Sequence, residues 1–432
     1  MKSIAMLGIG TVLGFGAVLG VMSARGADTS AYRQLDLFSE AFEKVRANYE
    51  RPVDDSELIS SAIQGMVSKL DPHSRYMDAK AYGGDFKVTT TGQFGGIGVL
   101  VTQDDDNIKV VSLTDGMPAA KAGIKPDDHI TAVDGVSIMG MSQNDAIDKM
   151  RGAPGSKIVL TILRESEKKP FDVTLQRAVV EVNATSWHRE GDIGYIRMPG
   201  FNQQTASGLE NGVRELKRQI GPGIKGYVLD LRNNPGGLLD QAIQVSDDFL
   251  NSGEIVSTRG RQPDDTQRYD AKFGDIIDGK PLVVLINAGT ASASEIVSGA
   301  LQDHKRATII GMTSFGKGSV QTIMPLDDSG GALSLTTARY YTPSGHSIQA
   351  QGIIPDIQVA QGNEDALTKL LRPSEADLSG HLAGDPVPEK RLNAPVIKPA
   401  PGKKYDDFQL SYALDLLHGK MTVASVTTSS KG

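Results

Sequence analysis

Cysteine is absent from this chain of 432 residues. Its absence excludes disulfide bonds, thiolate metal sites and a cysteine nucleophile at once. It also suits an oxidising compartment, in which stray thiols are a hazard. An excess of positive charge is missing too, because 45 Lys and Arg residues stand against 52 Asp and Glu residues, for a net charge of −7. No domain-wide basic stripe is available to neutralise phosphates, so the composition argues against nucleic acid as a partner.

What is present is the composition of an ordinary globular protein, with 39% hydrophobic and 22% charged residues. The chain is long for one domain and indicates two or three, each large enough to bury its own core.

The N-terminus carries the pattern of an export signal. Lys2 precedes the uncharged run "IAMLGIGTVLGFGAVLGVM" (4–22), and small polar residues follow it. The run is longer than most signal cores and approaches the ~20 residues that span a bilayer. We therefore predict that residues 1–27 are a signal peptide or a membrane anchor. The remainder is expected in the periplasm or on the outer face of the cytoplasmic membrane, associated with that membrane through 4–22 if the segment is not cleaved.

Residues 30–84 are predicted to form an N-terminal helical segment. Apolar residues recur there at helical spacing in two stretches. They are Phe38, Phe42, Val45 and Tyr49, then Ile59, Ala62, Ile63, Met66, Val67 and Leu70. The second helix is expected to stop at "LDPHS" (70–74), because Pro72 disfavours helix at Asp71. We expect His73 to be a structural hydrogen-bonding residue, since no second histidine or acid lies at ligand spacing.

Residues 85–178 change in character to short apolar strands punctuated by Gly, Pro and Asp, with two short helices. This pattern predicts a compact β-rich module of about 100 residues. The segment "PAAKAGIKPDDHITAVDGV" (118–136) resembles the middle of a PDZ domain, and "GGIG" (95–98) resembles its carboxylate-binding loop. The resemblance implies that backbone N–H groups there hold a C-terminal carboxylate while an adjacent strand edge pairs with the peptide. The implied peptide-binding residues are Gly95, Gly96, Ile97, Gly98 and Val99.

Residues 191–345 alternate between strand and helix patterns, which is typical of a layered α/β core. Beyond about residue 360 the chain becomes Pro-rich and polar. An amphipathic pattern over 406–419 interrupts this stretch. We predict that residues 361–432 form a linker, a docking helix and a tail.

The stretch "GMTSFGKGSVQ" (311–321) falls one residue short of a phosphate-binding loop, because Gly318 stands where a metal-binding Ser or Thr belongs. "SVQTIMPL" (319–326) alternates like a strand, whereas a phosphate-binding loop needs a helix there. Nucleotide binding is therefore disfavoured. Lys317 has no charged neighbour nearer in sequence than Arg306 and Asp327. Burial can lower the pKa of such a lysine by several units and make its amine a general base.

A serine nucleophile is favoured at "NAGTASASE" (287–295), where a strand ends and a helix begins. The helix N-terminus stabilises developing negative charge. No serine lies in a G-x-S-x-G motif. His304 follows Ser292 by 12 residues, about 18 Å along a helix, so a Ser-His-Asp triad is not evident locally. Ser292 and Ser294 remain alternatives at this point, because either serine can serve only as a helix cap.

Five segments together resemble the C-terminal processing peptidases, or tail-specific proteases, in the order found in that family. They are "GMVSKLDPHSRY" (65–76), "FGGIGV" (94–99), "LDLRNNPGGLL" (229–239), "ASASEIVSGALQD" (291–303) and "FGKGSVQ" (315–321). The resemblance covers roughly 32–360. It implies an α/β protease core of the crotonase-like kind over 179–360, with the PDZ domain over 85–178 inserted. No metal or organic cofactor is implied.

Carried onto this sequence, the resemblance makes Ser292 the nucleophile and Lys317, 25 residues later, the base. Gln321 is the supporting residue that orients the lysine amine. Ser294 becomes a structural serine and Glu295 a local hydrogen-bonding residue.

Two backbone N–H groups are needed to stabilise the oxyanion. Ala293 follows the nucleophile directly and is one candidate. The turn "RNNPGG" (232–237) offers the other, and either Gly236 or Gly237 lets the backbone approach the substrate. The choice between these two glycines stays open.

The expected function is that of an exported serine endopeptidase. Its PDZ domain would capture the apolar C-terminal ends of protein or peptide substrates and deliver them to Ser292, which forms an acyl-enzyme. A homo-oligomer and an adaptor protein are further expected partners. Two alternatives belong to other classes, namely a catalytically silent PDZ adaptor at the cell envelope and a nucleotide-binding protein built on 311–317.

Overall fold

A computed structural model describes residues 29–104, 107–167, 169–182, 184–326, 330–362, 373–385, 395–400 and 402–421. The predicted export signal, residues 1–27, lies outside these ranges. Within them, no helix combines the length and the apolar character needed to cross a membrane. The chain divides into two compact units after Gly65.

The first unit is helical, as the spacing of its apolar residues predicts. It contains α1 (Thr29–Asn48) and most of α2 (Asp55–Val67). Asp54 begins the second helix, because its carboxylate accepts a hydrogen bond from the Glu57 N–H at 3.1 Å. The prediction of helix over 30–84 is wrong for Arg75–Met77, which form strand β1. These three residues pair with β18 (Ala332–Tyr341). A local sequence pattern cannot predict pairing with a strand so distant in sequence.

The β-rich part of the second unit is entered through short helices and closed by a two-stranded ladder. The entry consists of α3 (Ala79–Ala81), η1 (Tyr82–Phe86) and α4 (Lys87–Thr91). Strand β2 (Gln93–Gly96) then pairs antiparallel with β9 (Ala178–Glu181), so the chain enters and leaves this part side by side.

Between β2 and β9 lies an antiparallel sheet in the order β3-β4-β5-β7-β8, with β6 beside β5. Its strands are β3 (Val99–Asp104), β4 (Asn107–Leu113), β5 (His129–Val133), β6 (Val136–Ser137), β7 (Lys157–Leu163) and β8 (Phe171–Gln176). Two helices, α5 (Pro118–Lys121) and α6 (Gln143–Met150), pack their buried alanine and methionine side chains against its apolar face. This part therefore has a core of its own.

The α/β part is built on a six-stranded sheet in the order β10-β11-β12-β15-β16-β19. Its strands are β10 (Ser186–Glu190), β11 (Ile193–Arg197), β12 (Gly226–Asp230), β15 (Leu282–Ile286), β16 (Thr308–Gly311) and β19 (Ile357–Gln358). All pairs are parallel except that of β10 with β11. β12 and β15 are buried along their whole length, as continuous apolar strands of a covered parallel sheet should be.

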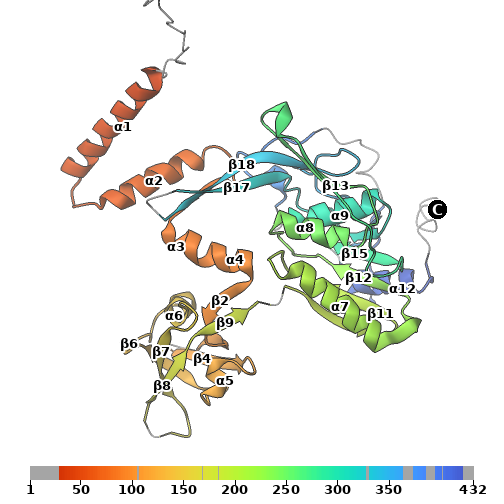
Figure 1. Cartoon of the computed structure of the whole chain (residues 1–432), viewed down its shortest axis with the longest axis horizontal. Helices are drawn as coiled ribbons and strands as arrows, with labels where there is room; N and C mark the ends of the chain where they lie inside the picture. The colour runs from red at the N-terminus through yellow and green to blue at the C-terminus, as the bar shows by residue number, and fades with distance from the viewer. Residues whose placement is uncertain are drawn as a thin grey trace, which may run out of the picture. The chain divides into compact units, whose positions relative to one another are not determined.

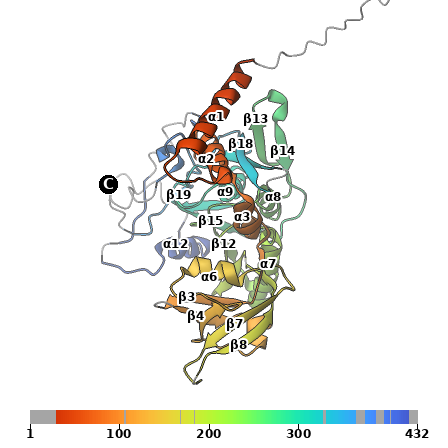
Figure 2. The same ribbon diagram turned by 90° about the vertical axis from the view of Figure 1, so that its left-hand side faces the viewer.

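Helices cover both faces of this sheet (Figures 1 and 2). They are α7 (Thr205–Ile220), α8 (Leu239–Asp247) and α9 (Ala293–Asp303) on one face, and α12 (Phe408–Leu417) on the other. Helix α12 lies within the predicted docking helix, and its Phe408 and Tyr412 are buried on the sheet. The α/β prediction is therefore confirmed.

A second antiparallel sheet adjoins the α/β part. Strand β17 (Ser319–Pro325) pairs with β18, which also pairs with β1 and with β13 (Glu254–Gly260), and β13 pairs with β14 (Gln267–Asp270). Three short 3₁₀ turns complete the described elements, namely η2 (Gly221–Gly223), η3 (Pro263–Asp265) and η4 (Glu375–Asp377).

Candidate active site

Three loops that follow neighbouring parallel strands meet at one edge of the α/β sheet. They follow β12, β15 and β16, which are adjacent in the sheet order. Backbone hydrogen bonds join them, since the Ala291 N–H donates to the Asn234 carbonyl at 2.9 Å and the Phe315 N–H donates to the Thr290 carbonyl at 2.9 Å. The carboxyl ends of parallel strands are where such folds place their sites. The predicted site residues Gly236, Ser292 and Lys317 lie one on each loop.

Ser292 occupies the N-cap of α9 in a backbone conformation that side-chain-bearing residues rarely adopt, with φ 54° and ψ −116°. Gly236 packs closely against this turn at Ser292. A Cβ atom on Gly236 would lie 2.8 Å from the Ser292 Cβ and 2.9 Å from the Ala293 nitrogen. Only glycine fits there, and Gly236 itself has φ 99°. Strain of this kind gathers at functional sites, because the surrounding structure must hold it.

Glu295 joins the serine turn to the lysine loop. It is completely buried, and its Oε2 accepts hydrogen bonds from the N–H groups of Ser292 at 2.7 Å and Lys317 at 2.9 Å. Its Oε1 accepts from the Ser314 hydroxyl at 2.6 Å and the Gly316 N–H at 2.7 Å. Burial raises the pKa of Glu295 to about 7, against the opposing effect of these four hydrogen bonds. Glu295 was predicted to form only local hydrogen bonds, but its carboxylate holds both the serine turn and the lysine loop.

Lys317 lies in the loop between β16 and β17. Burial lowers the pKa of its amine to about 8, while the negative charges of Glu375, Glu295 and Asp71 act in the opposite direction. The amine donates a short hydrogen bond to Oε1 of Gln321 and a longer one, of 3.3 Å, to the Ser319 carbonyl. The structure thus brings Gln321 to the lysine amine, in the place expected of an orienting residue.

His73 and Glu375 form a second polar pair beside the lysine loop. The His73 Nε2 lies 2.7 Å from the Glu375 Oε2, and the Gln349 side-chain amide donates to Oε1 at 2.9 Å. The Glu375 N–H donates to the Phe315 carbonyl at 3.0 Å. Burial would raise the pKa of Glu375, but the hydrogen bonds from His73 and Gln349 outweigh it and lower that pKa. His73 is thus a hydrogen-bonding residue, whereas Glu375 was missed, because it lies in the range predicted to be a linker.

The two candidate glycines of the oxyanion turn differ in their backbone contacts. The Gly236 N–H donates to the Asn234 side-chain oxygen at 2.9 Å. Gly237 bridges to Phe201 in a parallel arrangement whose hydrogen bonds are made by the flanking Gly236 carbonyl and Leu238 N–H. In such a bridge the N–H of the central residue points to the other side. Within the described chain, no group accepts a hydrogen bond from the Gly237 N–H.

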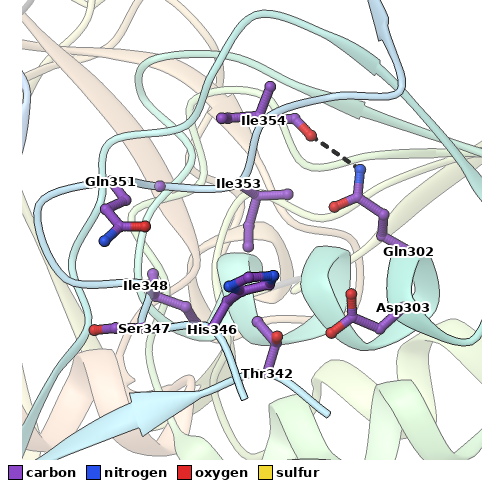
Figure 3. Close-up of a pocket in the computed structure, with 10 residues that line it drawn as sticks. Gln302, Asp303, Thr342, His346, Ser347, Ile348, Gln351, Ile353 and Ile354 are labelled. Carbon is purple, nitrogen blue, oxygen red and sulfur yellow. Dashed lines mark hydrogen bonds between the residues drawn. The ribbon is translucent and has the colours of Figure 1, made fainter. Parts of the chain in front are cut away.

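Ser294 and the two nearby histidines are separated from this chemistry. Ser294 is fully buried, and its hydroxyl donates to the Asn234 carbonyl at 3.1 Å. His304 is the C-cap of α9, at the end opposite Ser292. Figure 3 shows His346 around a small pocket together with Asp303, the last residue of α9. Eleven helical residues correspond to about 16 Å, so His346 lies at the wrong end of the helix to serve Ser292.

The lysine loop does not have the architecture of a phosphate-binding loop. It leads into strand β17, whereas a phosphate-binding loop leads directly into the N-terminus of a helix. Among the described residues, no group of three or more His, Asp or Glu side chains is placed to hold a metal ion.

The predicted peptide-binding residues lie at the entry to the β-rich sheet. Gly95 and Gly96 belong to β2 and pair with β9, which leaves Ile97 and Gly98 as the turn into β3, whose first residue is Val99. Gly98 has φ 77°, and a Cβ there would lie 2.3 Å from the Met117 Cβ. Strand β3 is the edge of its sheet, and α6 packs against it.

Three family models match this chain. Residues 192–359 match "Peptidase family S41", residues 95–175 match "PDZ domain", and residues 18–81 match "Activating protease CtpB N-terminal domain".

Relatives are similar over most of the chain. The carboxy-terminal-processing protease of Bartonella bacilliformis is 50% identical over 400 residues, which cover 92% of this chain and 91% of that protein. The carboxy-terminal processing protease CtpA of Bacillus subtilis is 37% identical over 349 residues, 80% of this chain and 72% of that one. Among solved structures, the photosystem II D1 C-terminal processing protease is 31% identical, covers 74% of this chain and 92% of its own, and has a TM-score of 0.43.

Proposed function

The chain belongs to the carboxy-terminal processing proteases of peptidase family S41, and we propose that it hydrolyses peptide bonds through a dyad of Ser292 and Lys317. The observation that carries this proposal is the hydrogen bonding of Glu295. One buried carboxylate oxygen holds both the N–H of the N-cap serine and the N–H of the lysine whose pKa is lowered to about 8. An exposed, charged lysine could not act as a base near neutral pH, but this amine can.

The reaction follows from the two groups. The neutral Lys317 amine takes the proton of the Ser292 hydroxyl as Oγ attacks the scissile carbonyl carbon. The resulting ammonium then gives this proton to the leaving amine, and the acyl-enzyme remains. A water molecule, deprotonated by the same amine, attacks the acyl group and releases Ser292.

We propose Ala293 and Gly237 as the oxyanion donors. The Ala293 N–H stands at the first helical position of α9, directly after the nucleophile. Gly237 is favoured over Gly236, because the Gly236 N–H already donates to Asn234. Gly236 instead provides the space that the Ser292 turn requires.

The substrate class that we propose is proteins with apolar C-terminal ends. The N–H groups of Ile97, Gly98 and Val99 would hold the terminal carboxylate, and the outer edge of β3 would pair with the peptide backbone. Val99 of β3 and Ile147 of α6 are partly exposed apolar side chains beside this strand, and they pack on the core that contains the buried Ala146 and Met150. These side chains favour an apolar terminal residue over a charged one.

We further propose export, on the strength of residues 4–22 alone. The mature enzyme would act in the periplasm or at the outer face of the cytoplasmic membrane. Fusion of residues 1–40 to a reporter that is active only outside the cytoplasm tests this, and a reporter that stays inactive would contradict it. Assembly as a homo-oligomer and use of an adaptor protein remain proposals that rest on the family resemblance.

The experiment for the proposed chemistry compares Ser292→Ala with Ser294→Ala on an unfolded model protein. Loss of the nucleophile removes the covalent route, whereas loss of the buried Ser294 hydroxyl removes one hydrogen bond worth about 1 kcal/mol. Cleavage should therefore vanish in the first variant and persist in the second. Equal loss in both, with folding intact by circular dichroism, would reassign the nucleophile. Cleavage by neither variant nor the wild type would favour a silent PDZ adaptor.

A further inference from the structure

We propose that Asp71 and Thr336 are positioning residues that fix which end of the Gln321 amide faces Lys317. This inference rests on the proposed dyad and extends it to the "LDPHS" turn, which the reaction as described leaves unused. The two residues lie 265 residues apart in sequence and meet on the sheet that carries the lysine loop.

Hydrogen bonds link Asp71 through Thr336 and Gln321 to Lys317, and Asp71 sets the direction of each of them. Its carboxylate can only accept, and Oδ1 receives the Thr336 hydroxyl at 3.0 Å. Because that hydroxyl donates its one hydrogen to Asp71, it can only accept from the Gln321 side-chain nitrogen, which lies at 3.1 Å. The Gln321 nitrogen also donates to the Ser319 hydroxyl at 3.0 Å. The remaining end of the amide, Oε1, therefore faces the Lys317 amine.

Asp71 is itself held firmly. It is 7% exposed, and it accepts from the Ser74 hydroxyl at 2.6 Å and from the N–H groups of His73 and Ser74, each at 2.9 Å. Burial raises its pKa, but these hydrogen bonds and that of Thr336 lower it overall, so the carboxylate stays ionised near neutral pH. A hydroxyl between two other hydroxyls can donate its hydrogen to either of them. The Thr336 hydroxyl lies beside an ionised carboxylate, so it donates to Asp71.

The sheet supplies the register that this contact needs. Gln321 on β17 lies directly opposite Thr336 on β18. The register shifts between Val320 and Gln321, and an irregularity of this kind re-aims the side chain that follows it. Strand β1 pairs with β18 at Ser334, and the Ser74 hydroxyl accepts from the Thr336 N–H at 3.1 Å. The "LDPHS" turn is thus fixed to the same strand.

The orientation matters because a neutral amine has one lone pair. With Oε1 towards it, the Lys317 amine donates to Gln321 and keeps its lone pair for the serine proton. With the amide turned around, the NH₂ group of Gln321 would donate to that lone pair and occupy it. Such a turned amide would also disfavour the ammonium form of Lys317, because it offers a donor in place of an acceptor.

The test compares Thr336→Val, which removes the hydroxyl at constant shape, with Thr336→Ser, which keeps it. Peptide cleavage is measured from pH 6 to 10 with the full-length enzyme. We expect Thr336→Val to lower kcat at least 10-fold with KM unchanged, and to move the midpoint of the pH profile to lower pH. Thr336→Ser should restore the wild-type profile. Thr337→Val is the matched control, since Thr337 is exposed on the same strand and its hydroxyl pairs with Thr322 at 2.6 Å.

The direction of the pH shift separates orientation from mere loosening. The charged groups that act on Lys317 are Glu375, Glu295, Asp71 and Arg75. Thr336→Val leaves all four in place. A loosened site admits water and moves the lysine midpoint upwards, which would overturn the proposal. A kcat equal to that of the wild type would overturn it as well.

A double-mutant cycle covers the case of a poorly folded Thr336→Val protein. If Thr336 acts only through the Gln321 amide, it has no further effect on kcat once Gln321 is replaced by Met. A second loss of the same size in the double variant contradicts the proposal. Lys317→Arg in the same assay separates a failure of the proposed dyad from a failure of the proposed orientation of Gln321. An active Lys317→Arg enzyme would contradict the proposed Ser292–Lys317 dyad. An inactive Lys317→Arg enzyme together with a fully active Thr336→Val enzyme would contradict only the proposed role of Thr336 in orienting the Gln321 amide.

Discussion

Lowering the pH should inactivate the enzyme, because it protonates the Lys317 amine. With a pKa of about 8, its neutral fraction is about 1% at pH 6, half at pH 8 and about 90% at pH 9. Activity should therefore rise about 50-fold from pH 6 to pH 8 and level off above pH 9. At pH 7 burial gives roughly 200 times more neutral amine than a free lysine with a pKa near 10.4 would have.

The assay is kcat/KM for an acetylated fluorogenic peptide with an apolar C-terminus, because this ratio reports groups on the free enzyme. The peptide has no group that titrates in the range. Tryptophan fluorescence and circular dichroism at each pH exclude unfolding as the cause of the decline.

One substitution should move the midpoint in a known direction. Glu375→Gln removes the negative charge that most opposes the effect of burial on Lys317, so the midpoint should fall. Asp377→Asn on the same turn is the control, because Asp377 pairs with Ser374 and has no place among the charges acting on the lysine. A midpoint near 6.5 would point to a histidine base instead. A midpoint near 10, or a flat profile between pH 6 and 8, would refute the buried-amine reasoning.

Three further predictions concern stability and specificity. Lys317→Met should raise the free energy of unfolding at pH 7 by up to about 3 kcal/mol, since its pKa falls from 10.5 to about 8 and each unit is worth about 1.4 kcal/mol. The gain should shrink as the pH rises from 8 to 10, where the folded lysine is already neutral, and a gain that grows with pH in urea titrations would contradict this. Arg232→Met should lower the free energy of unfolding by about 3–5 kcal/mol, because the fully buried Asp230 loses its nearest cation, at 2.6 Å, and keeps the more distant Arg197, at 3.5 Å. Asp407→Asn should cost less, because Asp407 is 29% exposed; similar losses in urea unfolding would argue against the reasoning. Adding Asp-Asp to the C-terminus of a substrate should raise KM, because two charges would meet the apolar side chains of Val99 and Ile147; an unchanged KM would mean that the β-rich part does not select the terminus.

The order of strands and helices around the site follows from local sequence patterns. The strand predicted to end and the helix predicted to begin at "NAGTASASE" (287–295) appear as β15, which ends at Ile286, and α9, which begins at Ala293. Such elements carry their signal in adjacent residues. Strand β1 does not, because its three residues become a strand only by pairing with Ser334 and its neighbours.

The contacts that position the site could not be predicted in the same way. His73 and Glu375 lie 302 residues apart in sequence and 2.7 Å apart in space. The choice between Gly236 and Gly237 depends on where two N–H groups point, which only the folded turn decides. Burial of Glu295 with four donors gives it a role that its place in a helix N-terminus alone does not indicate.

The most direct measurement of the dyad is a burst experiment with purified Lys317→Arg enzyme at pH 9. A chromogenic ester substrate releases one equivalent of its leaving group as Ser292 is acylated, and the size of this burst counts working sites. Arginine keeps the positive charge but does not deprotonate in proteins, so it cannot take the serine proton. We expect a full burst from the wild type and none from Lys317→Arg with its fold intact. A burst of normal size and rate from Lys317→Arg would show that Lys317 is not the base.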